Sequence, residues 1–275
     1  MTDQRLGFCR SALYLPASNA RAVEKAKGLP ADMIMLDLED AVAPENKEDA
    51  RLAAVSTSLA GFGSRLCAIR INGIGSEYFE ADCNAVAGSG ADYVVVPKVE
   101  SARDVVQIGQ VVSKPLLCMI ETPAGIYAAR DIAAQENVAG LIAGTNDLAT
   151  ELKMHPGAHR QGLELSLQMI VLAASASSKP CFDGVFNAID NLDGLETECM
   201  QGYQFGFTGK TLIHPAQIEM ANRCFMANDS EIEDAKALVE AAMGGAERFR
   251  GRMVETMHVE AAKLMIARAE AVGKE

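Results

Sequence analysis

Short apolar runs recur along the chain, and each is followed by a stretch in which apolar residues have helical spacing. The runs are continuous rather than alternating, as is typical of parallel strands covered on both faces. Eight runs have this character: Ala12–Leu15, Met33–Leu38, Leu66–Ile71, Tyr93–Val96, Leu116–Ile120, Gly140–Ala143, Cys181–Val185 and Thr211–Ile213. They predict eight β-strands that alternate with helices.

Capping residues and apolar spacing place the helices between these strands. Asn19 and Ser101 are N-cap residue types, and they predict helices that run to about Leu29 and Val112. Further helices are predicted over Pro44–Leu59, Gln161–Ala176, Asn191–Gly202, Ser230–Ala242 and His258–Ala271. The last two follow the eighth strand, so they lie outside the repeated strand–helix units.

Eight strand–helix units predict an α/β fold, a (β/α)8 TIM barrel with a C-terminal helical extension. An open, doubly wound sheet is the alternative. No linker rich in Pro, Gly or Ser interrupts the chain. We therefore expect one barrel domain over residues 1–228 and a helical extension over residues 229–275.

The charge balance limits the partners that the protein can have. The chain has 275 residues, with 25 Lys and Arg against 37 Asp and Glu, which gives a net charge of −12. Such a chain repels nucleic acid and anionic membranes, so an anionic ligand needs a local basic patch. Apolar runs are too short for a membrane span, and the first residues lack the apolar core of a secretory signal. Seven cysteines without a C-x-x-C pair predict reduced, buried thiols and a cytoplasmic location.

Polar residues follow the predicted strands directly, where a barrel gathers its catalytic groups. They are Asp37, Glu39, Asp40, Arg70, Asn72, Lys98, Glu100, Glu121, Asn146, Asp147, Asp183 and His214. Crowded carboxylates raise one another's pKa unless a cation neutralises them. Mg²⁺, with Mn²⁺ as an alternative, suits such oxygen ligands.

Glu121 and Asp147 are the expected metal ligands, because they end the fifth and sixth strands and small residues follow both. Gly144, Thr145 and Asn146 precede a helical stretch, so their amides are placed to hold a substrate carboxylate. The alternative interpretation is that each acid merely caps the next helix.

Other catalytic patterns are absent or incomplete. The sequence has no G-x-S-x-G and no Walker A motif, and Gly88-Ser89-Gly90 precedes a strand instead of following one. A serine hydrolase and a dinucleotide-binding protein are therefore disfavoured. Arg10, Arg21, Lys25 and Lys27 concentrate positive charge near the first strand, either as a solvated helix face or as a phosphate-binding patch.

Several stretches together resemble a known family, in order and over nearly the whole chain. They are RSALYLPASN, MIMLDLEDAVAPENKEDAR, AIRIN, VVVPKVE, CMIETPAGI, GLIAGTNDLA, GFTGKTLIHPAQI and RGRMVETMHVEAA. The sequence is similar to the citrate lyase β-subunit-like branch of the HpcH/HpaI aldolase superfamily. LDLEDAV with the downstream K-x-x-AR, and GK-x-x-IHPAQI, are its most specific patterns.

The resemblance implies a Mg²⁺-dependent carbon–carbon lyase of CoA thioesters, assembled as a homotrimer or hexamer. By motif, Glu121 and Asp147 would bind Mg²⁺, and Arg70 would contact the oxo or carboxylate group of the substrate. Glu39 and Asp40 would organise Arg70 and bound water. The remaining substrate contacts implied by motif are Tyr14, Arg21 and Lys25 for substrate or CoA phosphates, and Asp183 near the adenine.

The tail motif departs from the family, since Glu255 stands where several relatives have an Asp. In those relatives the Asp belongs to a lid over a neighbouring subunit's active site. The side chain of Glu255 is longer by one CH₂ and would reach further. The implied reaction cleaves a citramalyl-CoA, malyl-CoA or citryl-CoA type of thioester to acetyl-CoA and a 2-oxo acid. The alternatives are a β subunit of a citrate lyase complex that acts on an acyl-carrier-protein thioester, and an inactive barrel used as a scaffold.

Overall fold

The structure of the protein is a computed structural model that describes residues 4–155, 160–242, 245 and 247–272. The chain divides into two compact units, Met1–Arg223 and Cys224–Glu275. His159, one of the four histidines, lies outside the described residues.

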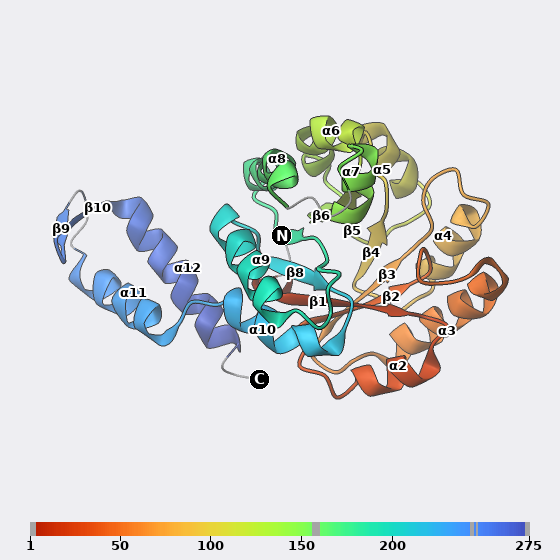
Figure 1. Cartoon of the computed structure of the whole chain (residues 1–275), viewed down its shortest axis with the longest axis horizontal. Coiled ribbons are helices and arrows are strands. Elements are labelled where there is room, and N and C mark those ends of the chain that lie inside the picture. Colours follow the sequence, from red (N-terminus) through yellow and green to blue (C-terminus); the bar gives the residue numbers. More distant parts are fainter. Residues whose placement is uncertain (1–3, 156–159, 243–244, 246, 273–275) are drawn as a thin grey trace. The chain divides into compact units, whose positions relative to one another are not determined.

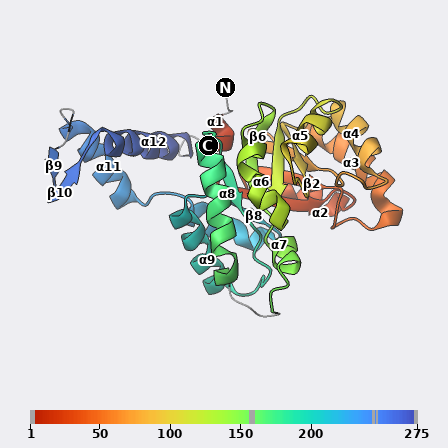
Figure 2. The same cartoon turned by 90° about the horizontal axis from the view of Figure 1, so that it is seen from above.

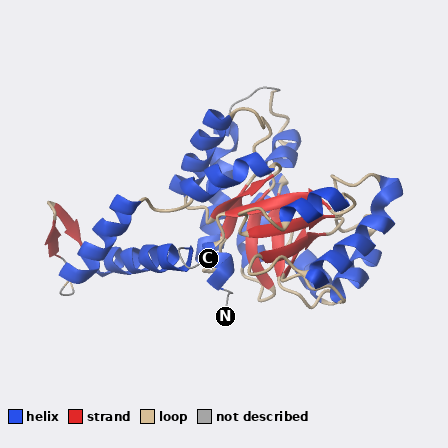
Figure 3. Cartoon of the chain, turned by 90° about the horizontal axis from the view of Figure 1, so that it is seen from below, coloured by secondary structure: helices blue, strands red, loops and turns tan. Residues whose placement is uncertain are grey.

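Eight parallel strands form a closed barrel in the first unit (Figures 1 and 3). Each strand pairs with the next along the chain, and β8 pairs with β1 through Ser11 and Lys210, so the ring is complete. The strands are β1 (Ser11–Pro16), β2 (Met33–Asp37), β3 (Leu66–Arg70), β4 (Tyr93–Val96), β5 (Leu116–Ile120), β6 (Val138–Ala143), β7 (Cys181–Asp183) and β8 (Gly209–Leu212). The predicted (β/α)8 barrel is confirmed. The open, doubly wound sheet is excluded, because the first and last strands pair with each other.

Helices surround the strand ring (Figures 1 and 2). Asn19 caps α2 through its side chain, and Ser101 forms a capping box with Asp104 at α5, as their residue types predict. The helices of this unit are α1 (Gln4–Phe8), α2 (Ala20–Ala26), η1 (Pro44–Asn46), α3 (Lys47–Ala60), α4 (Phe79–Ala87), α5 (Ala102–Gly109), α6 (Pro123–Ala133), α7 (Thr145–Glu151), η2 (Arg160–Leu163), α8 (Glu164–Ala176), α9 (Leu192–Phe205), η3 (Pro215–Gln217) and α10 (Ile218–Cys224). α6 was not among the predicted helices, although its buried residues Ile126, Ala129, Ile132 and Ala133 have helical spacing.

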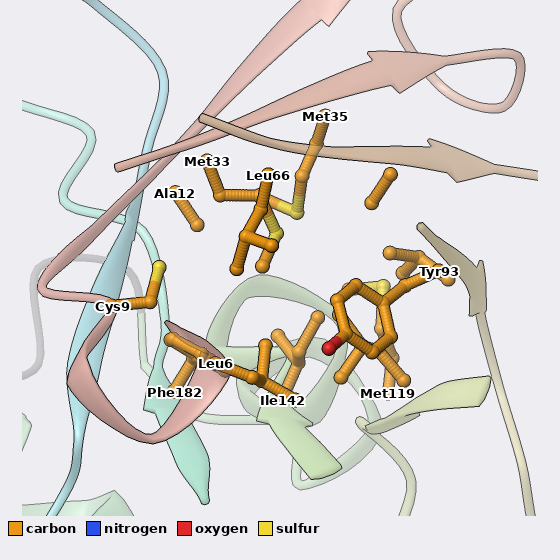
Figure 4. Packing of buried hydrophobic residues seen from close by; sticks show 13 residues of the cluster. Leu6, Cys9, Ala12, Met33, Met35, Leu66, Tyr93, Met119, Ile142 and Phe182 are labelled. Atoms are coloured by element: carbon orange, nitrogen blue, oxygen red, sulfur yellow. The ribbon is translucent and has the colours of Figure 1, made fainter. Parts of the chain in front are cut away.

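The barrel interior is packed with side chains rather than open. Inward-facing residues alternate along the strands, and Leu6 from α1 packs into the same cluster as Met33 and Leu66, the first residues of β2 and β3 (Figure 4). Helix α1 therefore covers the amino end of the barrel. The other end of the barrel is the carboxyl end, where a pocket opens among the strand ends.

The second unit contains two helices and a short hairpin. α11 (Asp229–Ala241) packs along α12 (Thr256–Val272), and Asn228 caps α11 with a capping box to Glu231. The hairpin of β9 (Glu247–Phe249) and β10 (Arg252–Val254) was not predicted, because its charged residues do not alternate with apolar ones. Among the described residues of both units, no helix has the length and apolar character that crossing a bilayer requires.

Candidate active site

A pocket of about 310 Å³ opens among the residues that end the strands. Seven of the eight strand ends or following loops contribute to its wall, as expected for the carboxyl end of a barrel. Its lining residues are Tyr14, Asp37, Asp40, Ala41, Arg70, Met119, Glu121, Ala143, Gly144, Thr145, Asn146, Asp147, Val185, Thr211 and Ile213. Most of the predicted site residues therefore meet in one place.

Arg70 is held rigidly by Asp37 on the neighbouring strand. The β2–β3 register sets the two residues opposite each other. The Nε and Nη2 groups of Arg70 donate to the two oxygens of Asp37, at 2.7 and 2.6 Å. Burial disfavours the charged guanidinium, but the hydrogen bonds and the negative charge of Asp37 outweigh it and raise the pKa of Arg70. Arg70 is therefore a fixed, permanent positive charge in the pocket wall.

The third guanidinium nitrogen of Arg70 points to the loop after β2. Its Nη1 lies 2.9 Å from Glu39 Oε2 and 3.7 Å from Asp40 Oδ2, and the ring of Tyr14 lies 4.8 Å from the guanidinium carbon. Burial raises the pKa of Glu39 to about 8, an effect that Arg70 opposes and Asp40 reinforces. Asp40 is the exposed acid of the pair. The predicted association of Arg70 with both acids is thus present in the structure.

Glu121 and Asp147 line the pocket together and share Lys98 as a partner. The backbone N–H of Lys98 donates to Glu121 Oε1 at 2.8 Å, and its ammonium lies 3.1 Å from Asp147 Oδ2. Burial raises the pKa of Glu121 to about 7, and the negative charge of Asp147 adds to this, while the Lys98 amide opposes it. The Lys98 ammonium offsets only one of the two carboxylate charges, so the three groups together keep a negative charge that a divalent ion would neutralise.

Two glycines make room for this arrangement. A Cβ on Gly144 would overlap the carboxylate of Glu121, and a Cβ on Gly184 would overlap the side chain of Thr145. The hydroxyl of Thr145 is buried at the pocket, and it has no hydrogen-bond partner among the residues that the structure describes. A buried hydroxyl without a partner is costly, so Thr145 offers the pocket a hydrogen-bonding group that the described residues do not use.

The donor set fits a hard divalent ion. The described residues contain no group of three His, Cys, Asp or Glu that would enclose a metal on their own. Two carboxylates and a hydroxyl at one pocket match Mg²⁺, which keeps water or substrate oxygens in its remaining positions. Glu121 and Asp147 are the residues that could hold it.

Three predicted substrate contacts lie outside the pocket lining. Asp183 is fully buried, and its carboxylate binds Arg160 at 2.6 Å and Lys210 at 3.0 Å in an ion cluster with Glu198. Asp183 therefore lies in a buried ion cluster, and its predicted contact with the substrate stays a prediction. Arg21 and Lys25 are exposed on α2, which follows β1.

Glu255 belongs to the second unit, between β10 and α12, where its N–H donates to His258. Asn146 lines the pocket and exchanges hydrogen bonds with Asn187.

Asp37 and Lys98 follow predicted strands, but the sequence alone indicates no role for either of them. The signal for Asp37 was its place opposite Arg70, which requires the strand register. Lys98 adopts a positive φ of 52°, an uncommon conformation for a residue other than glycine. In this conformation the backbone N–H of Lys98 binds Glu121 while its ammonium binds Asp147.

A barrel with ionisable residues gathered at its carboxyl end is the arrangement of TIM-barrel enzymes. Comparison with known proteins agrees. The model of the HpcH/HpaI aldolase/citrate lyase family matches residues 10–215, and that of the C-C bond lyases of the TIM-barrel fold matches residues 164–274. The chain belongs to the HpcH/HpaI aldolase/citrate lyase family, and it is an enzyme of the citrate lyase β-like type.

Individual relatives cover nearly the full length of the chain. A (3S)-malyl-CoA thioesterase of Cereibacter sphaeroides is 43% identical over 272 residues, which are 96% of this chain and 95% of that protein. The citrate lyase subunit β of Haemophilus influenzae is 33% identical over 95% and 97% of the two chains. The solved structure of CitE from Mycobacterium tuberculosis, in complex with magnesium, acetoacetate and coenzyme A, has a TM-score of 0.80 at 29% identity and covers 95% of this chain and 98% of that chain.

Proposed function

We propose that the protein is a Mg²⁺-dependent lyase that cleaves a 3-hydroxy-3-carboxyacyl-CoA, of the malyl-CoA or citramalyl-CoA type, to acetyl-CoA and a 2-oxo acid. The observation that carries the proposal is the meeting of Arg70, Glu121, Asp147 and the unpartnered Thr145 hydroxyl at one pocket. The names of the relatives support the substrate class, since they include a malyl-CoA thioesterase and a structure with magnesium and coenzyme A.

Glu121 and Asp147 would hold the ion. When bound, Mg²⁺ acts as a Lewis acid that polarises the substrate's hydroxyl and carboxylate oxygens and lowers the pKa of the hydroxyl. Its positive charge would also favour the charged form of Glu121, whose pKa is raised by burial and, to a smaller degree, by the negative charge of Asp147. Thr145 would donate its free hydroxyl to a substrate oxygen.

The chain's own residues would then handle the charges and the proton. Arg70, fixed by Asp37, faces the pocket and stabilises the negative charge that develops on the substrate, a role typically worth about 3 kcal/mol per donor. Asp40, exposed at the pocket, would accept the proton of the substrate hydroxyl. The C–C bond then breaks, its electron pair passes to the thioester as an enolate, and a 2-oxo acid is left.

A second subunit would complete the cycle. Glu255 of a neighbouring copy would protonate the enolate carbon to give acetyl-CoA, which makes the active form a homo-oligomer. Arg21 and Lys25, exposed on α2, would bind the CoA phosphates in a chain whose net charge otherwise repels them.

Thioester hydrolysis is the second candidate, favoured by the thioesterase that is 43% identical to this chain. In that reaction water attacks the thioester carbonyl, the C–S bond breaks, and CoA leaves as the thiol together with a hydroxy diacid. Cleavage and hydrolysis share the metal and Arg70, and they differ in which bond breaks.

One assay separates these outcomes. The protein is incubated with (3S)-malyl-CoA, citramalyl-CoA or citryl-CoA, with Mg²⁺ or with EDTA, and 2-oxo acid and free CoA thiol are measured in parallel. A lyase releases 2-oxo acid without thiol, whereas a thioesterase releases thiol without 2-oxo acid. An acyl-carrier-protein thioester is assayed as a fourth substrate. Turnover of that thioester alone would identify a complex subunit, and absence of turnover of all four substrates would indicate a scaffold. Full lyase activity in EDTA would overturn the metal requirement.

A further inference from the structure

Lys47 is a buried lysine outside the pocket lining, at the start of α3. Its ammonium donates to the carbonyl oxygens of Leu38 and Glu39, both at 2.7 Å, and to Asn72 Oδ1 at 2.8 Å. All three ammonium protons are therefore used. Two of them hold the backbone of the loop that presents Glu39 to Arg70.

A second set of bonds fixes the other side of this loop. Asn72 lies two residues after Arg70, and its Nδ2 donates to the Leu38 carbonyl at 3.0 Å and to Asp82 Oδ2 at 2.6 Å. Asp82 is fully buried and also accepts from the backbone N–H of Asn72 and from Arg51 Nε. Lys47 and Arg51 are one helical turn apart on α3, so a single helix face anchors both strand ends.

We propose that Lys47 is a positioning residue for the reaction: through the Leu38 and Glu39 carbonyls and Asn72, it fixes the β2 loop against the end of β3 and so holds Glu39 beside Arg70. This inference rests on the proposed function. It also gives a physical meaning to the K-x-x-AR pattern that follows LDLEDAV in the sequence, because Lys47 and Arg51 are its two cations.

The carbonyl contacts of Lys47 hold the β2 loop in place. The Leu38 carbonyl oxygen accepts hydrogen bonds from both Lys47 and Asn72, so one atom connects the β2 loop to α3 and to the end of β3. If a neutral residue replaces Lys47, the buried carbonyls of Leu38 and Glu39 each lose a hydrogen-bond donor. Buried acceptors without donors are costly, so the β2 loop is expected to shift until they find new partners. A shift of about 1 Å in a group next to the reacting atoms can lower the rate about 100-fold.

The test compares Lys47→Met with a matched control, Arg65→Met. Arg65 is also a cation that donates to backbone carbonyls, those of Phe62, Ala26 and Leu29, but it does so before β3, at the amino end of the barrel. With the full-length protein and its best thioester substrate, we expect Lys47→Met to lower kcat about 100-fold with a smaller change in KM. Arg65→Met is expected to lower the thermal unfolding midpoint and to leave kcat near the wild-type value.

A double-mutant cycle separates positioning from general destabilisation. If Lys47 acts through Glu39, then Lys47→Met in a Glu39→Gln background lowers kcat far less than it does in the wild type. Multiplicative losses in the cycle would overturn the proposal, as would an equal loss of kcat in Arg65→Met. If Lys47→Met does not fold, Asn72→Ala takes its place in the same cycle, because it removes the third Lys47 contact and the second Leu38 contact.

Hydrogen exchange supplies a measurement that does not need turnover. In the full-length protein, Lys47→Met is expected to accelerate amide exchange in residues 37–42, and Arg65→Met is not. Unchanged exchange and unchanged kcat in Lys47→Met overturn the role of Lys47 while wild-type turnover upholds the proposed function. Absence of wild-type turnover on every thioester overturns the proposed function and with it the catalytic role of Lys47, and exchange then reports only on the loop.

Discussion

Arg70 and Asp37 form a two-bonded ion pair across the β2–β3 register at the carboxyl end of the barrel. Arg10 and Asp32 form the same kind of pair at the opposite end, where Arg10 precedes β1 and Asp32 precedes β2. Only the first pair borders the pocket among the residues described. The Arg10–Asp32 pair can therefore serve as a control for the Arg70–Asp37 pair.

Asp37→Asn is expected to lower kcat/KM about 100-fold, because the amide cannot hold both guanidinium nitrogens and Arg70 loses its fixed orientation. Urea unfolding should show a loss of about 1.5–3 kcal/mol, the usual cost of a hydrogen bond to a charged group. Asp32→Asn should lose a similar amount of stability with kcat/KM nearly unchanged. Equal losses of activity in both variants would contradict a special role for the Arg70–Asp37 pair.

Glu121→Gln is expected to abolish binding of a divalent ion, because one of two protein carboxylates becomes a neutral amide. Mn²⁺ titration followed by electron paramagnetic resonance measures this without a substrate. Glu100→Gln is the control, since Glu100 is an exposed acid two residues after Lys98 and does not line the pocket. Unaltered Mn²⁺ affinity in Glu121→Gln would remove Glu121 from the metal site.

Gly144→Ala tests the close approach between two loops. The added methyl group would occupy the place of the Glu121 carboxylate, so either Glu121 or the loop must move. We expect Mn²⁺ binding to weaken at least about tenfold, which corresponds to about 1.4 kcal/mol. Gly88→Ala is the matched control, because its Cβ would meet only the Ala85 carbonyl at 3.9 Å. A folded Gly144→Ala protein with wild-type metal affinity would show that the approach is not important for the site.

Asp183→Asn decides between the structural placement of Asp183 and the substrate contact that the family resemblance implies. The fully buried Lys210 would lose one of its two carboxylate partners, which are Asp183 and Glu198. Breaking a buried ion pair costs about 3–5 kcal/mol, so the unfolding free energy should fall by that order while KM for the thioester stays constant. A raised KM with unchanged stability would restore the substrate-binding interpretation.

The seven cysteines should react slowly with thiol reagents at pH 8. All of them are buried, and burial raises the pKa of Cys67, Cys118 and Cys181 to about 12, so the reactive thiolate is scarce. Native protein mixed with a disulfide reagent is expected to release little chromophore within minutes, and unfolding in urea should release all seven equivalents. Rapid reaction of the native protein would show that at least one thiol is accessible.

The barrel was predictable because buried parallel strands leave continuous apolar runs. The exceptions have physical causes. β8 begins at Gly209, two residues before the predicted strand. The prediction left out Lys210 because it is charged, but in the barrel wall its charge is neutralised by Asp183 and Glu198. β7 ends at Asp183 and not at Val185, and the Asp183 carboxylate is part of the same ion cluster.

The meeting of Glu121 and Asp147 in one pocket was foreseeable, because adjacent strands end at the same face of a barrel. The pairing of Asp37 with Arg70 was not, because a register cannot be read from apolar runs that tolerate shifts. The role of Lys98 was also hidden. It depends on a left-handed backbone conformation that nothing in the residue type requires.

The parallel pairing of β1 with β8 joins two strands that are separated by almost 200 residues of chain. During synthesis, residues 11–16 leave the ribosome long before residues 209–212, and until then the first and latest strands are open edges that can pair wrongly. The barrel therefore cannot close until the ribosome has released the eighth strand, and both edge strands lack a partner until then.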